Sequence, residues 1–92
     1  MILMFYKVKA VHPLADFILA VAFENGTRKL YDIKPLFARW EAFKALQTIT
    51  GLYTCVQVDD GGYGISWNDE IDLSCDELYE NGVHHETNHP LY

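Results

Sequence analysis

The sequence has no lysine or arginine after Lys44. Residues 1–44 hold all seven bases and four acids, a net charge of +3, whereas residues 45–92 hold nine acids and no such base, a net charge of −9. Nucleic-acid binding normally requires a clustered basic surface, because neutralised phosphates supply much of the affinity. We therefore expect no nucleic-acid partner. The acidic half suits either a solvated surface that keeps the protein soluble or a docking surface for a basic partner.

Long apolar runs and cysteines are also scarce. No run approaches the roughly 20 apolar residues that span a bilayer, and lysines follow rather than precede the apolar opening Met1–Tyr6, unlike in a secretory signal. With no sign of export, we expect Cys55 and Cys75 to be reduced thiols. Hydrophobic residues make up 50% of the chain, which excludes intrinsic disorder. We expect one folded cytoplasmic domain without a membrane partner.

The first third of the chain predicts an antiparallel meander of three strands. Residues 6–11 alternate between apolar and lysine side chains, the period of a half-buried strand. A turn is expected at His12–Asp16, because its proline cannot donate a ladder hydrogen bond. The apolar run Phe17–Phe23 predicts a central strand covered on both faces. Asn25-Gly26 predicts a two-residue type I′ hairpin into a third strand at Thr27–Ile33.

The middle of the chain predicts a helix followed by a strand pair. Leu36, Trp40 and Phe43 have the i, i+4, i+7 spacing of one helix face, which favours core packing over a cofactor site. Two strands are expected next, at Tyr53–Val58 and Tyr63–Trp67, joined by an Asp-Asp-Gly-Gly turn. After a three-residue break the second of these strands resumes.

A second helix and a tail complete the predicted fold. Ser74 and Glu77 match a capping box, in which the hydroxyl accepts from the Glu77 amide while the Glu77 side chain reaches back. This helix should stop at Asn81-Gly82, which tolerates a left-handed conformation. The predicted class is α+β, an antiparallel sheet of about five short strands in β-β-β-α-β-β-α order with one or two short helices. Residues 1–82 form the predicted domain, and residues 83–92 a polar, histidine-containing tail.

A series of short segments follows this order of elements. The segments are residues 11–19, residues 23–26, residues 31–36, Phe43 and Leu46, residues 65–67, residues 71–73, and Leu78-Tyr79. As an ordered series over about residues 8–82, they resemble the bacterial family called domain of unknown function 2442. The chain departs from the family pattern at Asp69-Glu70, where the family usually has a glycine in the turn after the tryptophan.

The resemblance implies a small α+β fold and no established activity. Some relatives carry an appended helix-turn-helix domain, for which this chain is too short. Others are similar to products encoded beside a small partner protein, in an arrangement suggestive of a toxin–antitoxin or regulatory pair. The resemblance therefore points to a protein partner, while the departure at Asp69-Glu70 puts the geometry and any shared role of that turn in question.

Acidic residues of the C-terminal half form the first candidate site. They are Asp59, Asp60, Asp69, Glu70, Asp72 and Asp76. If the strand pair brings them together, they suit a hard cation or a paired-carboxylate hydrolase. Their spacing does not match an EF-hand loop, and turn formation or helix-dipole complementarity explains the same residues, so we assign neither a metal nor a catalytic site. The candidate interaction surface consists of Trp67, Asp69, Glu70, Asp72 and Asp76.

Histidines and one cysteine form the second group of candidates. His84, His85 and His89 are weak metal candidates, because imidazoles bind zinc or nickel but no packed scaffold is expected around them. Cys75 begins the predicted second helix, where a thiolate is favoured, but the acidic side chains that follow it oppose that charge. We assign no nucleophile and expect no cofactor.

Two functions from different classes suit this sequence. The first is a protein-interaction or regulatory module that docks a partner, or a second copy, through a sheet edge or the acidic half. Its candidate aromatic anchors are Trp40, Tyr53, Tyr63, Trp67 and Tyr79, each of which also suits the core. The second is a small-molecule or metal-binding enzyme that uses the region Asp59–Asp76. We favour the first, because 92 residues leave little room for a pocket.

Overall fold

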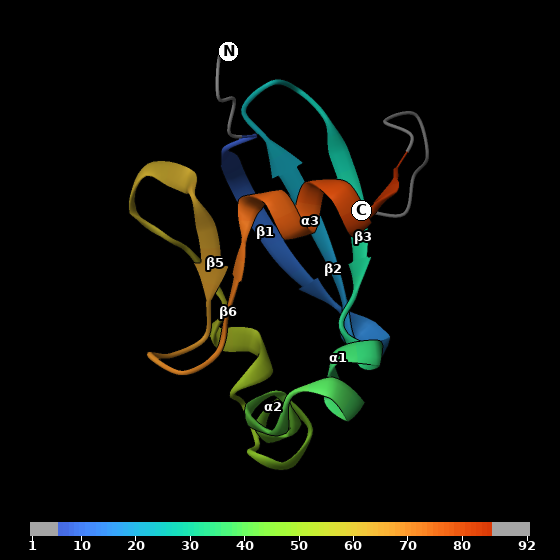
Figure 1. The fold of residues 1–92 in the computed structure, drawn as a ribbon, viewed down its shortest axis with the longest axis vertical. Coiled ribbons are helices and arrows are strands. Elements are labelled where there is room, and N and C mark those ends of the chain that lie inside the picture. The colour runs from blue at the N-terminus through green and yellow to red at the C-terminus, as the bar shows by residue number, and fades with distance from the viewer. Residues whose placement is uncertain (1–5, 86–92) are drawn as a thin grey trace.

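Two antiparallel sheets form the framework of this computed structural model, which describes residues 6–85 (Figure 1). One sheet has the order β1-β2-β3-β7 and the other the order β4-β5-β6. The strands are β1 (Val8–Leu14), β2 (Ile18–Phe23), β3 (Arg28–Asp32), β4 (Gln57–Val58), β5 (Gly64–Ser66), β6 (Asp72–Ser74) and β7 (Val83–His84). The predicted α+β class is confirmed, with the strands divided between two sheets.

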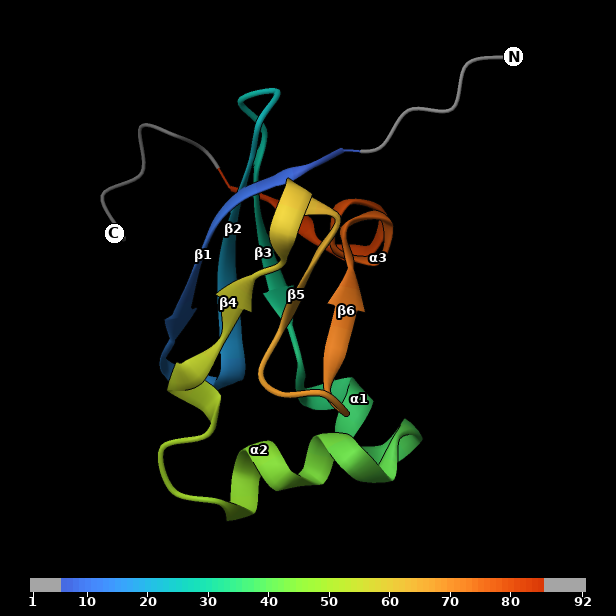
Figure 2. The ribbon, with the colours of Figure 1, turned by 90° about the vertical axis from the view of Figure 1, so that its left-hand side faces the viewer.

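Short helices connect and cover these sheets. The α-helices are α1 (Lys34–Arg39), α2 (Ala45–Thr48) and α3 (Cys75–Asn81); the 3-10 helices are η1 (Ala15–Phe17), η2 (Glu41–Lys44), η3 (Tyr53–Cys55) and η4 (Asp60–Gly62). Figure 2 shows α3, β5 and β6 on the same side of the strands β1, β2 and β3, with α1 and α2 at one end of the molecule. None of the helices among residues 6–85 has the length and apolar character that a membrane crossing requires.

The core lies between the four-stranded sheet, the three-stranded sheet and α3. Its largest fully buried side chains are Val8, Leu19, Val21, Phe23, Ile33, Ile65, Ile71 and Leu78. They come from both sheets, from α3 and from the connections, and they form one contiguous cluster. Burial of each large side chain contributes about 1.5–3 kcal/mol relative to exposure, so the shared core is the main stabilising contact between the two sheets.

The first connection differs from the prediction. The expected turn at His12–Asp16 is wrong, because β1 continues to Leu14 and pairs Pro13 with Leu19. A proline is tolerated there because β1 is an edge strand of its sheet. The turn lies at η1 instead, where Asp16 and Phe17 have φ values of +64° and +57°.

The hairpin at Asn25-Gly26 is confirmed, but its type is not the predicted one. Phe23 N donates to Thr27 O at 2.9 Å, and Gly26 N donates to Phe23 O at 3.0 Å, so the loop has three residues. Within this loop only Gly26 has a positive φ, +92°. This geometry matches a type I turn followed by a left-handed glycine rather than a two-residue type I′ turn, which requires two positive φ values.

Two predicted elements in the middle of the chain are shorter than expected. The helix breaks at Trp40, whose φ and ψ of −129° and 115° are extended. The strand expected at Tyr53–Val58 contains the 3-10 helix η3, and only Gln57–Val58 pair as β4. Tyr53 does not continue the ladder, because its hydroxyl lies 2.7 Å from the Leu14 carbonyl oxygen and turns the side chain toward the first sheet.

At the C-terminal end, α3 begins as predicted and stops differently. The Ser74 hydroxyl accepts from the Glu77 amide at 3.1 Å, which confirms the cap. Gly82 has a φ of −75°, so the left-handed stop is wrong, and the chain instead extends directly into β7. Residues 83 and 84, expected at the start of the tail, pair with Leu30 and Lys29 of β3. The tail from residue 86 onward lies outside the described residues.

The substitution Gly62→Ala should lower the free energy of unfolding more than Gly26→Ala. Both glycines have positive φ, +80° and +92°, where an L side chain costs about 1–2 kcal/mol. A Cβ at position 62 would also lie 2.7 Å from the Val8 carbonyl oxygen, whereas one at position 26 would meet nothing within 4 Å. Urea denaturation measures both losses. Equal losses would contradict the packing of the β4–β5 connection against β1.

Candidate functional site

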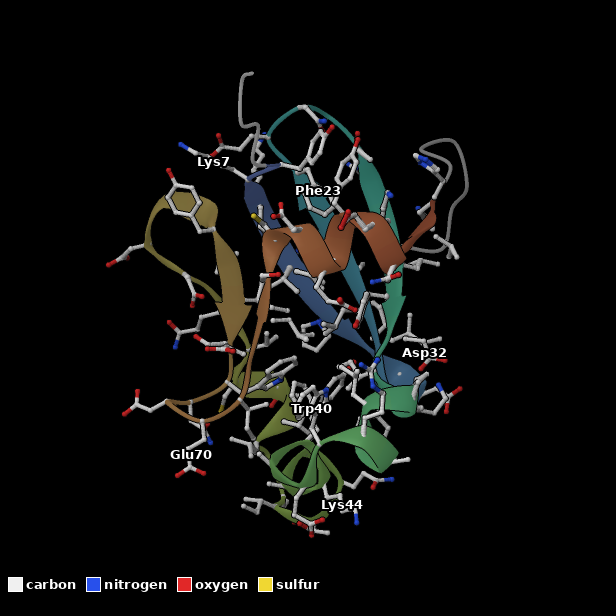
Figure 3. All side chains as sticks on the ribbon, in the orientation of Figure 1. Lys7, Phe23, Asp32, Trp40, Lys44 and Glu70 are labelled. Carbon is white, nitrogen blue, oxygen red and sulfur yellow. The ribbon has the colours of Figure 1, made fainter. Side chains whose placement is uncertain are left out.

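The most exposed tryptophan of the protein stands beside a groove between the α1–η2 segment and β6. The groove encloses about 410 Å³. We call it the Trp40 groove; its lining residues are Leu36, Arg39, Trp40, Ala42, Phe43, Glu70, Asp72, Leu73, Ser74 and Glu77. Leu36, Phe43 and Leu73 are buried and supply an apolar floor, while the Trp40 side chain is 54% exposed. In Figure 3, Trp40, Glu70 and Lys44 lie toward the same end of the molecule, opposite Lys7 and Phe23.

Trp40 is exposed because the helix ends just before it. Its amide donates to the Leu36 carbonyl at 2.9 Å and closes the last turn of α1, after which the extended Trp40 backbone redirects the chain into η2. The i, i+4, i+7 spacing therefore does not place Trp40 with Leu36 and Phe43 in the core. Its ring instead lies near the Arg39 guanidinium, with 5.9 Å from Cζ to the ring centroid, a cation–π arrangement.

The turn between β5 and β6 brings Glu70 to the opposite side of the groove. The Asn68 side-chain oxygen accepts from the Glu70 and Ile71 amides, both at 2.9 Å. Ile71 is 2% exposed, so the turn is anchored in the core immediately after Glu70. Two residues further on, Asp72 begins β6 and also lines the groove. The asparagine side chain thus fixes the turn between β5 and β6.

The charge of the Trp40 groove is negative. Its lining contains three carboxylates, those of Glu70, Asp72 and Glu77, and one guanidinium, that of Arg39. The three ion pairs between side chains of residues 6–85 join Lys34 and Lys44 to other acids, so neither Glu70 nor Asp72 forms an ion pair among these residues. Apolar floor, exposed aromatic ring and acidic rim together suit an apolar group flanked by a base.

One carboxylate of the groove is fixed by the sheet. The Tyr31 hydroxyl of β3 donates to Glu77 Oε2 at 2.7 Å. Burial, then the hydrogen bond and the charge of Glu77, raise the pKa of Tyr31 above its ordinary value. The Glu77 side chain therefore does not return to the start of α3, as the predicted capping box requires. Its hydrogen bond to Tyr31 instead joins α3 to β3. Tyr31 and Glu77 both line a second hollow, together with Pro35, Asn81 and Val83. Glu77 lines the Trp40 groove as well, so the two hollows adjoin there.

The residues of the predicted interaction surface lie in different places. Glu70 and Asp72 line the Trp40 groove. Asp69 lines an adjoining hollow, and Asp76 is exposed in the first turn of α3. Trp67 is only 7% exposed, and its Nε1 donates to the Tyr53 carbonyl at 2.9 Å, so its ring belongs to the core.

The other candidate aromatic anchors are also dispersed. Tyr53 is half-buried, and burial raises the pKa of its hydroxyl to about 12. Tyr79 stacks on Tyr6 with 3.7 Å between ring centroids. Tyr63 is 50% exposed in the β4–β5 connection and does not line the Trp40 groove. Trp40 is thus the candidate anchor that combines exposure with an adjoining groove.

The acidic residues do not converge. Asp59 and Asp60 lie in the β4–β5 connection, whereas Asp69 and Glu70 lie in the β5–β6 turn, and Figure 1 shows these two connections at opposite ends of the three-stranded sheet. Asp59 accepts instead from the Ser66 hydroxyl at 2.6 Å. Among residues 6–85, no group of three or more His, Cys, Asp or Glu side chains is placed to hold a metal ion.

The weak histidine candidates are divided in the same way. His84 is exposed in β7, while His85 is 8% exposed and its amide donates to the Arg28 carbonyl at 3.0 Å. His89 lies outside the described residues. His84 and His85 are therefore part of a strand and its extension.

The sequence named Trp40 as a candidate anchor, although its spacing with Leu36 and Phe43 favoured the core, and it gave no sign of the roles of Arg39 and Glu77. The available signal for Trp40 was that charged residues, Arg39 and Glu41, flank it on both sides, which argues against a continuous core stripe. Glu77 carried a signal for a helix cap but none for its bond to Tyr31, because that contact joins residues 46 positions apart.

Comparison with known proteins gives one match. A family model described as Protein of unknown function (DUF2442) matches residues 8–84. The match extends through β7, two residues beyond the boundary expected at Gly82. No curated protein and no solved structure matches the chain.

In the native protein we expect Cys55 to react with a thiol reagent and Cys75 to react only on unfolding. Both thiols are free; Cys55 is exposed, and Cys75 is 2% exposed. Burial, together with the charge of Asp76, raises the pKa of the Cys75 thiol and removes reactive thiolate. A colorimetric thiol assay, with and without denaturant, counts the groups. Rapid reaction of two thiols in the native protein would contradict the buried position of Cys75.

The substitution Tyr31→Phe should destabilise the protein by about 1–3 kcal/mol at neutral pH, because it leaves the Glu77 carboxylate without its donor. Folding raises the pKa of Tyr31, so the stability from this hydroxyl is complete below the ordinary value of 10.0 and decreases as pH rises above it. The difference in the free energy of unfolding between wild type and variant should therefore become smaller at alkaline pH. Urea denaturation of wild type and variant at neutral and alkaline pH measures this difference. A constant difference would contradict the assignment.

Proposed function

We propose that this chain, which belongs to the family Protein of unknown function (DUF2442), is a protein-interaction domain that docks a partner segment in the Trp40 groove. The observation that carries the proposal is the 54% exposure of Trp40 over an apolar floor. Tryptophan is among the residues enriched at the positions that dominate binding energy in protein interfaces, and such positions lie in well-packed pockets.

Burial of Trp40 would supply much of the binding free energy. A tryptophan presents about 150–250 Å² of surface, so covering its exposed half removes roughly 100 Å² from water and contributes about 2.5 kcal/mol. The ring is held beside Arg39, and the chain around it is fixed by α1 and η2, so little ordering entropy is lost on binding.

The acidic rim defines the chemistry of the partner segment. Glu70 and Asp72 are exposed and make no ion pair among the described residues, and they stand on the side of the groove opposite Trp40. A segment with an apolar side chain for the floor and a neighbouring lysine or arginine for these carboxylates is complementary to the groove. Attraction between exposed charges acts mainly on the association rate and weakens with added salt.

We also propose that the chain acts in the cytoplasm and that its partner is produced together with it. Cys55 and Cys75 form no disulfide, which is consistent with a reducing cytoplasm. A basic partner protein produced together with this chain, as in a regulatory pair, has the required charge. The groove is open, so a partner can dock without rearrangement of the core.

A peptide library displayed against the full chain tests this proposal. We expect enrichment of peptides with an aromatic or aliphatic residue next to lysine or arginine. Trp40→Ala should weaken the selected peptides at least tenfold, which corresponds to about 1.4 kcal/mol or more. Asp72→Lys should mainly slow association, and more at low salt than at high salt. Binding is followed by the fluorescence of Trp40, or by calorimetry for the Trp40 variant.

Tyr63→Ala is the matched control, because Tyr63 is also half-exposed but lies in the β4–β5 connection. This variant should bind the selected peptides like the wild type. Equal weakening by Tyr63→Ala and Trp40→Ala, or selection of peptides without basic residues, would overturn the proposed groove.

A further inference from the structure

The four-stranded sheet has one face that no described segment covers. We call it the outer sheet face; its residues are Ala10, His12 and Leu14 of β1, Ile18, Ala20 and Ala22 of β2, Arg28, Leu30 and Asp32 of β3, and Val83 of β7. They alternate with the core residues of the same strands, such as Leu19 and Val21, and therefore point to the other side. Figure 2 shows α3, β5 and β6 all on the core side.

The strand register arranges this face in three rows. In the first row, Ala10, Ala22 and Arg28 are neighbours; in the second, His12, Ala20, Leu30 and Val83; in the third, Leu14, Ile18 and Asp32. The first row is built on small side chains and borders a hollow of about 340 Å³. The third row has two large aliphatic side chains. Ile18, Leu30, Asp32 and Val83 of the second and third rows border another hollow, of about 400 Å³.

The charge of the outer sheet face also differs between its alanine end and its aliphatic end. Lys9 and Arg28 border the hollow at the alanine end. Asp32 and Asp16 lie at the aliphatic end, with Lys34 between them at 3.0 Å and 3.4 Å from the respective carboxylates. The alanine end therefore has a net charge of +2 and the aliphatic end −1. A face that is basic at one end and acidic at the other is complementary in charge to itself when inverted.

We propose that the occupant of this face is a second copy of the chain, packed face to face about a twofold axis that runs across the strands through the Ala20 row. Such an axis places the first row of one copy over the third row of the other. Arg28 then faces Asp32 of the second copy, and Ala22 faces its Ile18. Each contact occurs twice, as an isologous interface requires.

The second copy is favoured over pairing through a sheet edge. At one edge, β7 has only two residues, and at the other, β1 lies close to β4. Face-to-face packing of aligned sheets, about 10 Å apart, involves the ten residues of the outer sheet face, of which Ala20 is only 2% exposed. Each outward residue covers about 33 Å², given strands about 4.8 Å apart and a two-residue repeat of about 6.8 Å, so each copy contributes roughly 330 Å².

The small area makes the dimer weak. Stable interfaces bury about 800 Å² per partner, more than twice this value. We therefore expect a dissociation constant on the order of 0.1 mM rather than a permanent dimer. None of the residues that line the Trp40 groove belongs to the outer sheet face.

Sedimentation equilibrium of the full chain between about 10 μM and 1 mM tests the proposal. The wild type should change from monomer to dimer over this range. Leu30→Glu should abolish the dimer, because it places two carboxylates opposite each other at the axis. Ile49→Glu, at a side chain that is 55% exposed on α2's C-terminal side, should leave it intact. Circular dichroism establishes that each variant is folded, and Arg28→Glu serves as a second disrupting variant at an exposed position.

A charge exchange tests the twofold arrangement itself. Arg28→Glu and Asp32→Lys should each be monomeric alone, because like charges then face each other across the interface. Mixed together they should form a heterodimer, in which position 28 of either copy again faces the opposite charge at position 32. Monomer at every concentration, or a dimer that Leu30→Glu and Arg28→Glu leave unchanged, would overturn the proposal. A dimer without recovery in the mixture would overturn this axis.

Discussion

The structure depends on one constraint: α3 covers a single face of the four-stranded sheet. Leu78 of this helix is fully buried against the sheet. Beside it, the Lys29 ammonium of β3 donates to the Tyr79 carbonyl and lies 4.2 Å from the Tyr79 ring centroid. A buried lysine is tolerated only with such partners, so this contact fixes how α3 lies on the sheet. The Tyr31–Glu77 bond ties the same two elements together.

Because α3 covers only one face of the four-stranded sheet, the described residues leave two apolar regions exposed on different sides of the molecule. The Trp40 groove forms where α1 ends and meets β6, and the outer sheet face is the side that α3 leaves open. A chain of this size buries only about 60–65% of the surface that its unfolded form exposes, so such regions are expected. Their charges differ: the groove is acidic, whereas the sheet face has a basic end and an acidic end.

Local patterns were sufficient for the meander and for the start of α3. The apolar run of β2, the Asn25-Gly26 turn and the Ser74 cap each depend on neighbouring residues. Glu70 and Asp72 of the groove were identified as acidic surface residues. The break at Trp40, the pairing of β7 and the Tyr31–Glu77 bond were not predicted, because each depends on contacts between residues far apart in sequence. Trp67 was assigned to a surface that its buried indole does not reach.

We propose Trp40 as the exposed anchor, whereas Trp67 is a core residue. Hydroxyl-radical footprinting with mass spectrometry compares the oxidation of both indoles in the same sample, first in the free chain and then with a bound partner segment. We predict rapid oxidation of Trp40 in the free chain, protection of Trp67, and protection of Trp40 once the segment is bound. Protection of Trp40 in the free chain, or its unchanged oxidation in the complex, would contradict the account.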